Sequence, residues 1–76
     1  MVTAEELLQR NEPLKDKYFN YKLHNYSERV YALSEPVSDK NTGIKFLPIR
    51  TSKGNILNMP TTCFKQLELI IDDKTS

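Results

Sequence analysis

Near the start of the chain, apolar residues recur with the period of a helix. Thr3-Ala4-Glu5-Glu6 has the form of a capping box, in which Thr3 accepts from the third amide of a helix and Glu6 reaches back to the cap. The pattern therefore predicts that a helix begins here, with Leu7 and Leu8 on its buried side.

The same period continues beyond Pro13. A proline cannot lie comfortably inside a helix, but it suits the first position of a new one. Leu14 and Tyr18 keep the helical spacing, with either Tyr21 or Phe19 as the next apolar position. We therefore expect a helix, or a helix pair kinked at Pro13, that extends to about residue 20.

The middle of the chain favours strands. Residues 28–35 and 44–50 are rich in β-branched and aromatic residues, and turn-forming residues lie between them. Gly54 lies in a tight-turn sequence that predicts a hairpin between the second segment and a third strand at 55–58. Pro48 lacks an amide donor, so we expect it at a sheet edge or a bulge.

The last apolar positions again have helical spacing. Phe64, Leu67 and Ile71 lie at i, i+3 and i+7, which predicts an amphipathic helix. The alternative interpretation is a strand over residues 67–71, because that segment is short and rich in β-favouring residues. Residues 72–76 are polar, and we expect them to be frayed.

These elements predict an α+β fold in a single small domain, residues 1–76. It comprises an N-terminal helix, either continuous or kinked at Pro13, a three-stranded antiparallel sheet and a C-terminal amphipathic helix. A chain of 76 residues has room for one core but not for a large pocket. Recognition on a surface is therefore the natural use of such a chain.

Charge is unevenly distributed, although the formal net charge is only +1. Between residues 40 and 67 there are five cations and no acid. A basic face selects polyanions or acidic protein surfaces by long-range attraction. Lysine exceeds arginine eight to three, which with the frequent Asn and Ile indicates an AT-rich genome and leads us to expect a phage or mobile-element product.

Candidate catalytic and metal-binding residues are few. The single histidine, His24, and the single cysteine, Cys63, are too few for a common zinc site. Cys63 has no evident base partner, and neither glycine belongs to a phosphate-binding loop. We therefore expect no metal, no cofactor and no enzyme activity. One cysteine and no apolar leader or membrane-spanning run predict a cytoplasmic protein.

Aromatic residues and cations alternate between Lys15 and Tyr31. Such aromatic residues either fill the core and the edge of a protein interface or stack on the bases of a single-stranded nucleic acid. We expect a regulatory or inhibitory protein that binds a larger protein. The alternatives are a single-stranded DNA- or RNA-binding protein and a homo-oligomeric assembly subunit. The expected contact residues, for a protein or a nucleic acid, are Arg29, Tyr31, Lys45, Arg50 and Lys53.

Overall fold

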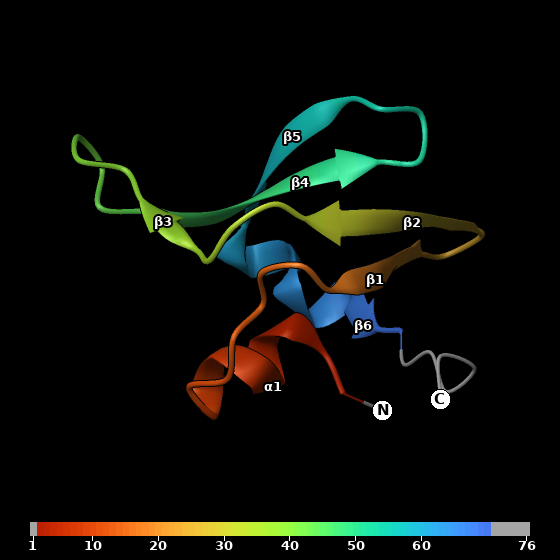
Figure 1. Cartoon of the computed structure of the whole chain (residues 1–76), viewed down its shortest axis with the longest axis horizontal. Coiled ribbons are helices and arrows are strands. Elements are labelled where there is room, and N and C mark those ends of the chain that lie inside the picture. The colour runs from red at the N-terminus through yellow and green to blue at the C-terminus, as the bar shows by residue number, and fades with distance from the viewer. Residues whose placement is uncertain (1, 71–76) are drawn as a thin grey trace.

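A computed structural model describes residues 2–70 as one curved antiparallel sheet with a short α-helix and a 3₁₀ helix (Figure 1). The helices are α1 (Ala4–Gln9) and η1 (Thr61–Gln66). The strands are β1 (Tyr18–Leu23), β2 (Tyr26–Ala32), β3 (Val37–Ser38), β4 (Lys45–Thr51), β5 (Ile56–Pro60) and β6 (Leu67–Leu69). None of the helices in this part of the chain is long and apolar enough to cross a bilayer.

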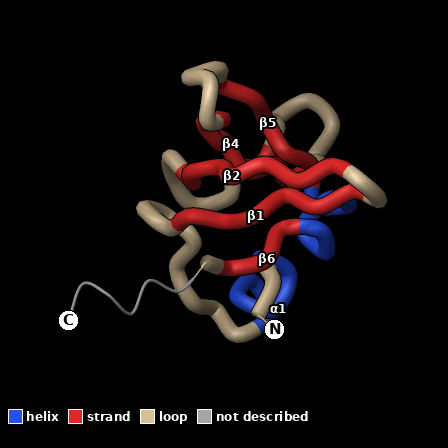
Figure 2. Tube along the Cα trace, turned by 90° about the vertical axis from the view of Figure 1, so that its right-hand side faces the viewer, coloured by secondary structure: helices blue, strands red, loops and turns tan. Residues whose placement is uncertain are grey.

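The sheet is a meander whose last strand returns beside the first. β1 pairs with β2, β2 with β4 and β4 with β5, while β6 lies on the free side of β1. The short β3 follows β2 along the same side of β4. β5 and β6 are thus outer strands, as is the two-residue β3, and α1 lies on the β6 side (Figure 2).

The core lies on one face of this sheet. Strand alternation turns Phe19, Val30 and Ile49 inward, and all three are buried. Leu7 of α1 and Phe64 of η1 close the core from the other side. The opposite face of the sheet, here called the outer face, has no helix over it in the described part of the chain.

The N-cap at Thr3 is confirmed, whereas the Glu6 carboxylate pairs with Arg10 instead of reaching back to the cap, and the helix is short. Thr3 Oγ1 accepts from the Glu6 amide at 3.3 Å, and α1 ends at Gln9. Asn11 then adopts a positive φ of 59°, and the carboxylate of Glu35 accepts from the amides at positions 14 and 15, at 3.0 and 3.1 Å. The chain between Asn11 and Tyr18 is therefore held as a loop.

The predicted helix to residue 20 is wrong. Residues 18–23 form β1, in which Phe19 is buried and Tyr18 is 46% exposed. The helical spacing of Leu14 and Tyr18 is real, but alternation in β1 also buries one face. Pairing with both β2 and β6 decides in favour of the strand, because it satisfies the backbone of β1 on both sides.

The predicted C-terminal amphipathic helix is also wrong. Residues 61–66 form only the 3₁₀ helix, which buries Phe64, and Leu67–Leu69 form β6. Leu67 is fully buried because it lies opposite Tyr21 on the core face. The strand alternative is thus the one that the structure shows. Ile71 and the predicted frayed tail lie outside the described residues.

The sheet has six strands and not the expected three, because β1 and β6 form where helices are predicted and β3 forms in the connection between β2 and β4. The hairpin around Gly54 is confirmed: Gly54 has a φ of 89° and its amide donates to Thr51 O at 2.9 Å. Pro48 lies in the interior strand β4, opposite the interruption between β2 and β3. Its missing amide therefore breaks no ladder bond there.

Candidate functional site

Four large side chains lie together on the outer face of the sheet. Tyr18 of β1 is directly opposite Tyr31 of β2, which in turn is opposite Arg50 of β4. Arg29 precedes Tyr31 by two positions and therefore shares its face. We call these four residues the arginine–tyrosine row.

The side chains of the row contact one another in sequence. The Arg29 guanidinium carbon lies 5.7 Å from the centre of the Tyr18 ring, and that of Arg50 lies 5.3 Å from the centre of the Tyr31 ring. The two rings are 4.9 Å apart at an interplanar angle of 54°. Each tyrosine thus contacts one guanidinium group and one aromatic ring. Both contacts are favourable, because the quadrupole of an aromatic ring attracts cations and the edges of other rings.

Asp16 fixes the middle of the row. Its backbone amide donates to Ala32 O at 2.9 Å, and its φ is 65°. The Tyr31 hydroxyl donates to Asp16 Oδ1 at 2.6 Å. This hydrogen bond raises the pKa of the Tyr31 phenol above its ordinary value, and nearby Arg50 opposes the rise. Tyr31 therefore keeps its proton, and its ring has a fixed orientation.

The two guanidinium groups have no carboxylate partner between residues 2 and 70. The ion pairs in this part of the chain join Arg10 to Glu6 and Lys22 to Glu68, at 3.5 and 3.4 Å. Arg29 and Arg50 are exposed. Because a guanidinium presents a planar fork of donors that matches carboxylate and phosphate, both remain available to an anionic group of a partner.

The row borders an open hollow of about 190 Å³. Its lining comprises Tyr18, Arg29, Val30, Tyr31, Arg50, Thr51 and Ser52. This volume is below the roughly 300–1,000 Å³ of pockets that enclose small molecules. The geometry favours recognition of a side chain or short segment on an open surface.

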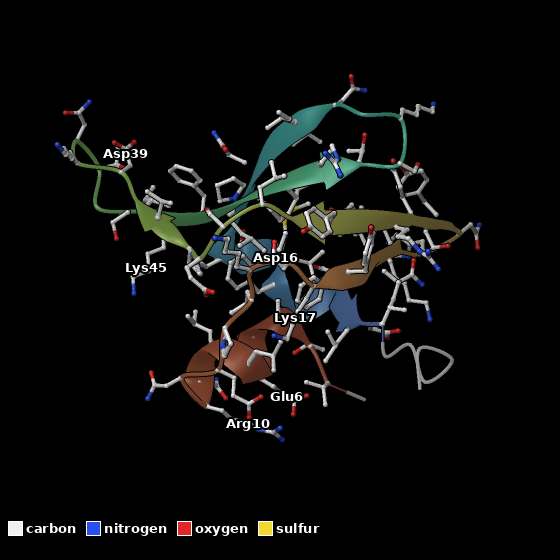
Figure 3. All side chains as sticks on the ribbon, in the orientation of Figure 1. Glu6, Arg10, Asp16, Lys17, Asp39 and Lys45 are labelled. Carbon is white, nitrogen blue, oxygen red and sulfur yellow. The ribbon has the colours of Figure 1, made fainter. Side chains whose placement is uncertain are left out.

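Of the five predicted contact residues, the structure brings three together, Arg29, Tyr31 and Arg50. Lys45 does not belong to this group, because it begins β4 and is opposite Ser38 on the other face of the sheet. Figure 3 shows Lys45 beside β3, away from Asp16 near the centre of the view. The cations that the sequence places in the middle of the chain therefore do not form one face.

Lys53 lies in the turn between β4 and β5, near Glu28. Glu28 accepts from the Tyr26 hydroxyl and from both the amide and the hydroxyl of Ser52, at 3.3 and 3.1 Å for Ser52. These hydrogen bonds, that of Tyr26 first, and the charge of Lys53 lower the pKa of Glu28. Glu28 thus fastens the turn to β2 through Ser52, and Lys53, in this turn, does not belong to the arginine–tyrosine row.

Sequence reasoning missed Tyr18 and Asp16. Tyr18 was placed in a helix, where it would not lie opposite Tyr31; its alternation with buried Phe19 is the signal that identifies the strand. Cys63 is half-buried beside the core and His24 lies in the exposed β1–β2 turn. Within residues 2–70, no three His, Cys, Asp or Glu side chains converge as metal ligands would.

No protein-family model, curated protein or solved structure matches this chain.

Proposed function

We propose that this chain is a non-enzymatic regulatory or inhibitory protein that docks on a larger protein through its outer sheet face. The observation that carries the proposal is the arginine–tyrosine row, with two guanidinium groups that no carboxylate neutralises within residues 2–70. Tyrosine and arginine are, with tryptophan, the residues enriched among the anchors of protein interfaces.

The surroundings of the row support a protein partner. Ile56 is opposite Arg50 on the same face and is 66% exposed, so an apolar contact adjoins the charged one. The rings of Tyr18 and Tyr31 are already oriented, which reduces the entropy lost on binding. A partner segment with an aspartate or glutamate beside an apolar residue fits this surface.

Single-stranded DNA or RNA is the second candidate, and the tyrosine pair favours it, because bases stack on aromatic rings displayed by a sheet. Two carboxylates on the same surface weigh against it. Asp16 accepts a hydrogen bond from Tyr31 of the row, and Glu68 already pairs with Lys22. A track for phosphates requires a more uniformly positive surface.

Capture of partners from host lysate, with and without nuclease, tests the proposal. We expect the unaltered chain to retain a protein in both samples. The double variant Arg29→Ala with Arg50→Ala is expected to lose it. A matched control, Lys45→Ala with Lys65→Ala, also removes two exposed cations but leaves the row intact. Equal capture by both double variants would refute the assignment of the site.

Salt dependence separates the two candidate partners. Binding to a nucleic acid releases counterions, so the logarithm of affinity falls steeply with the logarithm of salt concentration. The affinity of a protein interface built on tyrosine and isoleucine depends less on salt concentration. Retention that disappears after nuclease treatment and has a steep salt slope would favour the nucleic acid. We place this activity in the cytoplasm of the host of a phage or mobile element, in keeping with the single cysteine and the lysine-rich composition.

A further inference from the structure

β5 is an open sheet edge. One side of β5 pairs with β4, and no strand within residues 2–70 pairs with its other side. The opposite edge of the sheet differs, because Thr3 bridges to Glu68 and so covers β6. Among residues 2–70, β5 is therefore the one strand of more than two residues that is unpaired along a whole side, since β3, which also has an unpaired side, has only two (Figure 1).

The register shows which backbone groups this edge offers. The amide of Thr51 donates to Asn55 O at 2.8 Å, so residues 51 and 55 form a hydrogen-bonded pair. Such pairs recur at every second residue of an antiparallel ladder. Leu57 and Met59 therefore bond to β4, whereas the backbone groups of Ile56 and Asn58 point outward. Pro60 has no amide and ends the usable edge.

This edge lacks the features that normally prevent strand pairing. Natural edge strands are blunted by charged side chains, bulges or a covering segment. β5 contains no charged residue, and its one proline is the last residue. Ile56 and Leu57 are 66% and 50% exposed, one on each face of the sheet. Both apolar side chains gain cover if another strand is added.

We propose that two copies of this chain pair β5 with β5 about a twofold axis. Ile56 of each copy lies opposite Asn58 of the other, and each such pair exchanges two backbone hydrogen bonds. The axis passes between the two Leu57 residues, which form a non-hydrogen-bonded pair, the kind whose side chains approach most closely. The two sheets thereby become one continuous sheet.

Two observations favour a second copy as the occupant. A strand without charge meets its own copy without like-charge repulsion, whatever the register. One open edge strand of usable length per chain gives a closed dimer, whereas two such strands would give a polymer; β3, with two residues, is too short to serve as the second. The twofold axis is perpendicular to the sheet, so both outer faces point the same way. If the proposed partner site holds, the dimer presents two arginine–tyrosine rows and gains avidity for a multivalent partner.

Analytical ultracentrifugation of the purified chain tests the dimer. Over about a hundredfold range of concentration, we expect the mass to rise from one chain to two. Leu57→Lys and Leu57→Glu each place like charges at the axis and are expected to weaken association by about tenfold or more. An equimolar mixture of the two variants should restore the dimer, because opposite charges then meet at the axis.

Ile44→Lys is the matched control, since Ile44 is 56% exposed but lies outside β5, in the loop before β4. It is expected to leave association unchanged, and circular dichroism verifies that all variants are folded. Amide exchange adds a second measurement: protection of Ile56 and Asn58 should increase with concentration. A chain that stays monomeric throughout, or a dimer that neither Leu57 variant weakens, would overturn the proposal. The proposal would also be overturned if the equimolar mixture of Leu57→Lys and Leu57→Glu did not restore the dimer.

Discussion

The two edges of the sheet differ in how the chain completes them. At β6, the Leu69 amide donates to Val2 O at 2.8 Å, Thr3 bridges to Glu68, and Leu67 is fully buried. At β5, no segment within residues 2–70 covers the outer side, and Ile56 is 66% exposed. The β6 edge is therefore paired and packed against the core, whereas the β5 edge has unpaired backbone groups.

The comparison indicates that stability and binding are assigned to different parts of a very small domain. A chain of this size buries only about 60% of its unfolded surface, so it has little stability to spare. The covered edge joins the two ends of the described chain, α1 and β6, across the core. The open edge lies beside Arg50, the nearest residue of the arginine–tyrosine row.

The largest expected effect comes from truncating a leucine at each edge. Leu67→Ala leaves a cavity beneath α1 and η1 and should reduce the free energy of unfolding by about 2–5 kcal/mol. Leu57→Ala at the half-exposed open edge should cost less than about 1 kcal/mol in the monomer. Urea denaturation at low protein concentration measures both. Equal losses would contradict the division between the edges.

The next effect concerns the cap beside the covered edge. Thr3→Ala removes the side-chain acceptor of the Glu6 amide and should lower stability by about 1 kcal/mol, the usual loss for an N-cap. Thr3→Ser keeps an acceptor oxygen and is the matched control, with a smaller loss. Because Thr3 also bridges to Glu68, faster exchange of the Leu69 amide in Thr3→Ala would show that the cap supports the edge. Unchanged exchange of the Leu69 amide would show that the N-cap and the covered edge are independent.

Local signals in the sequence identify some of these features. The N-cap at Thr3 and the tight turn at Gly54 act within a few residues, and both are present as predicted. The alternation in β2 brings Arg29 and Tyr31 onto one face, and pairing with β4 adds Arg50. Three of the five expected contact residues therefore lie together.

The remaining features depend on contacts between distant parts of the chain. Residues 18–23 and 67–69 fit a helical period as well as an alternating one, and their mutual pairing selects the strand. A helix that extends to residue 20 does not place Tyr18 opposite Tyr31, whereas the pairing of β1 with β2 does. Lys45 is excluded from the row by its position on the opposite face of β4, at the end that pairs with β3.

A smaller effect is expected from placing a lysine on each edge. Glu68→Lys removes the ion pair with Lys22 and sets two cations together, which should cost about 0.5–1 kcal/mol. Asn58→Lys adds a charge to the exposed open edge and should change monomer stability by less than about 0.5 kcal/mol. Thermal unfolding of the two variants in low salt measures the difference. A greater loss in Asn58→Lys would show that β5 is already covered in solution.

The smallest effect concerns Glu28, which fastens the turn that leads into β5. Hydrogen bonds from Tyr26 and Ser52 hold the pKa of Glu28 below its ordinary value. A carboxylate with a lowered folded-state pKa stabilises the fold above its unfolded pKa, and this contribution is lost as pH falls through the folded pKa. Glu28→Gln should therefore be less stable than the unaltered chain at neutral pH, and the difference should vanish in acid.

The two edges should respond differently to this change. In Glu28→Gln at neutral pH, amides of the β4–β5 hairpin should exchange faster, whereas the Leu69 amide at the covered edge should not. The pKa of Tyr26 provides an independent check, because its hydrogen bond to Glu28 raises that pKa, and it should fall toward 10.0 in the variant. Glu12→Gln, which removes an exposed carboxylate in the loop after α1, controls for the lost charge. Equal acceleration at both edges would mean that Glu28 stabilises the whole sheet, and the open edge would then have no independent anchor.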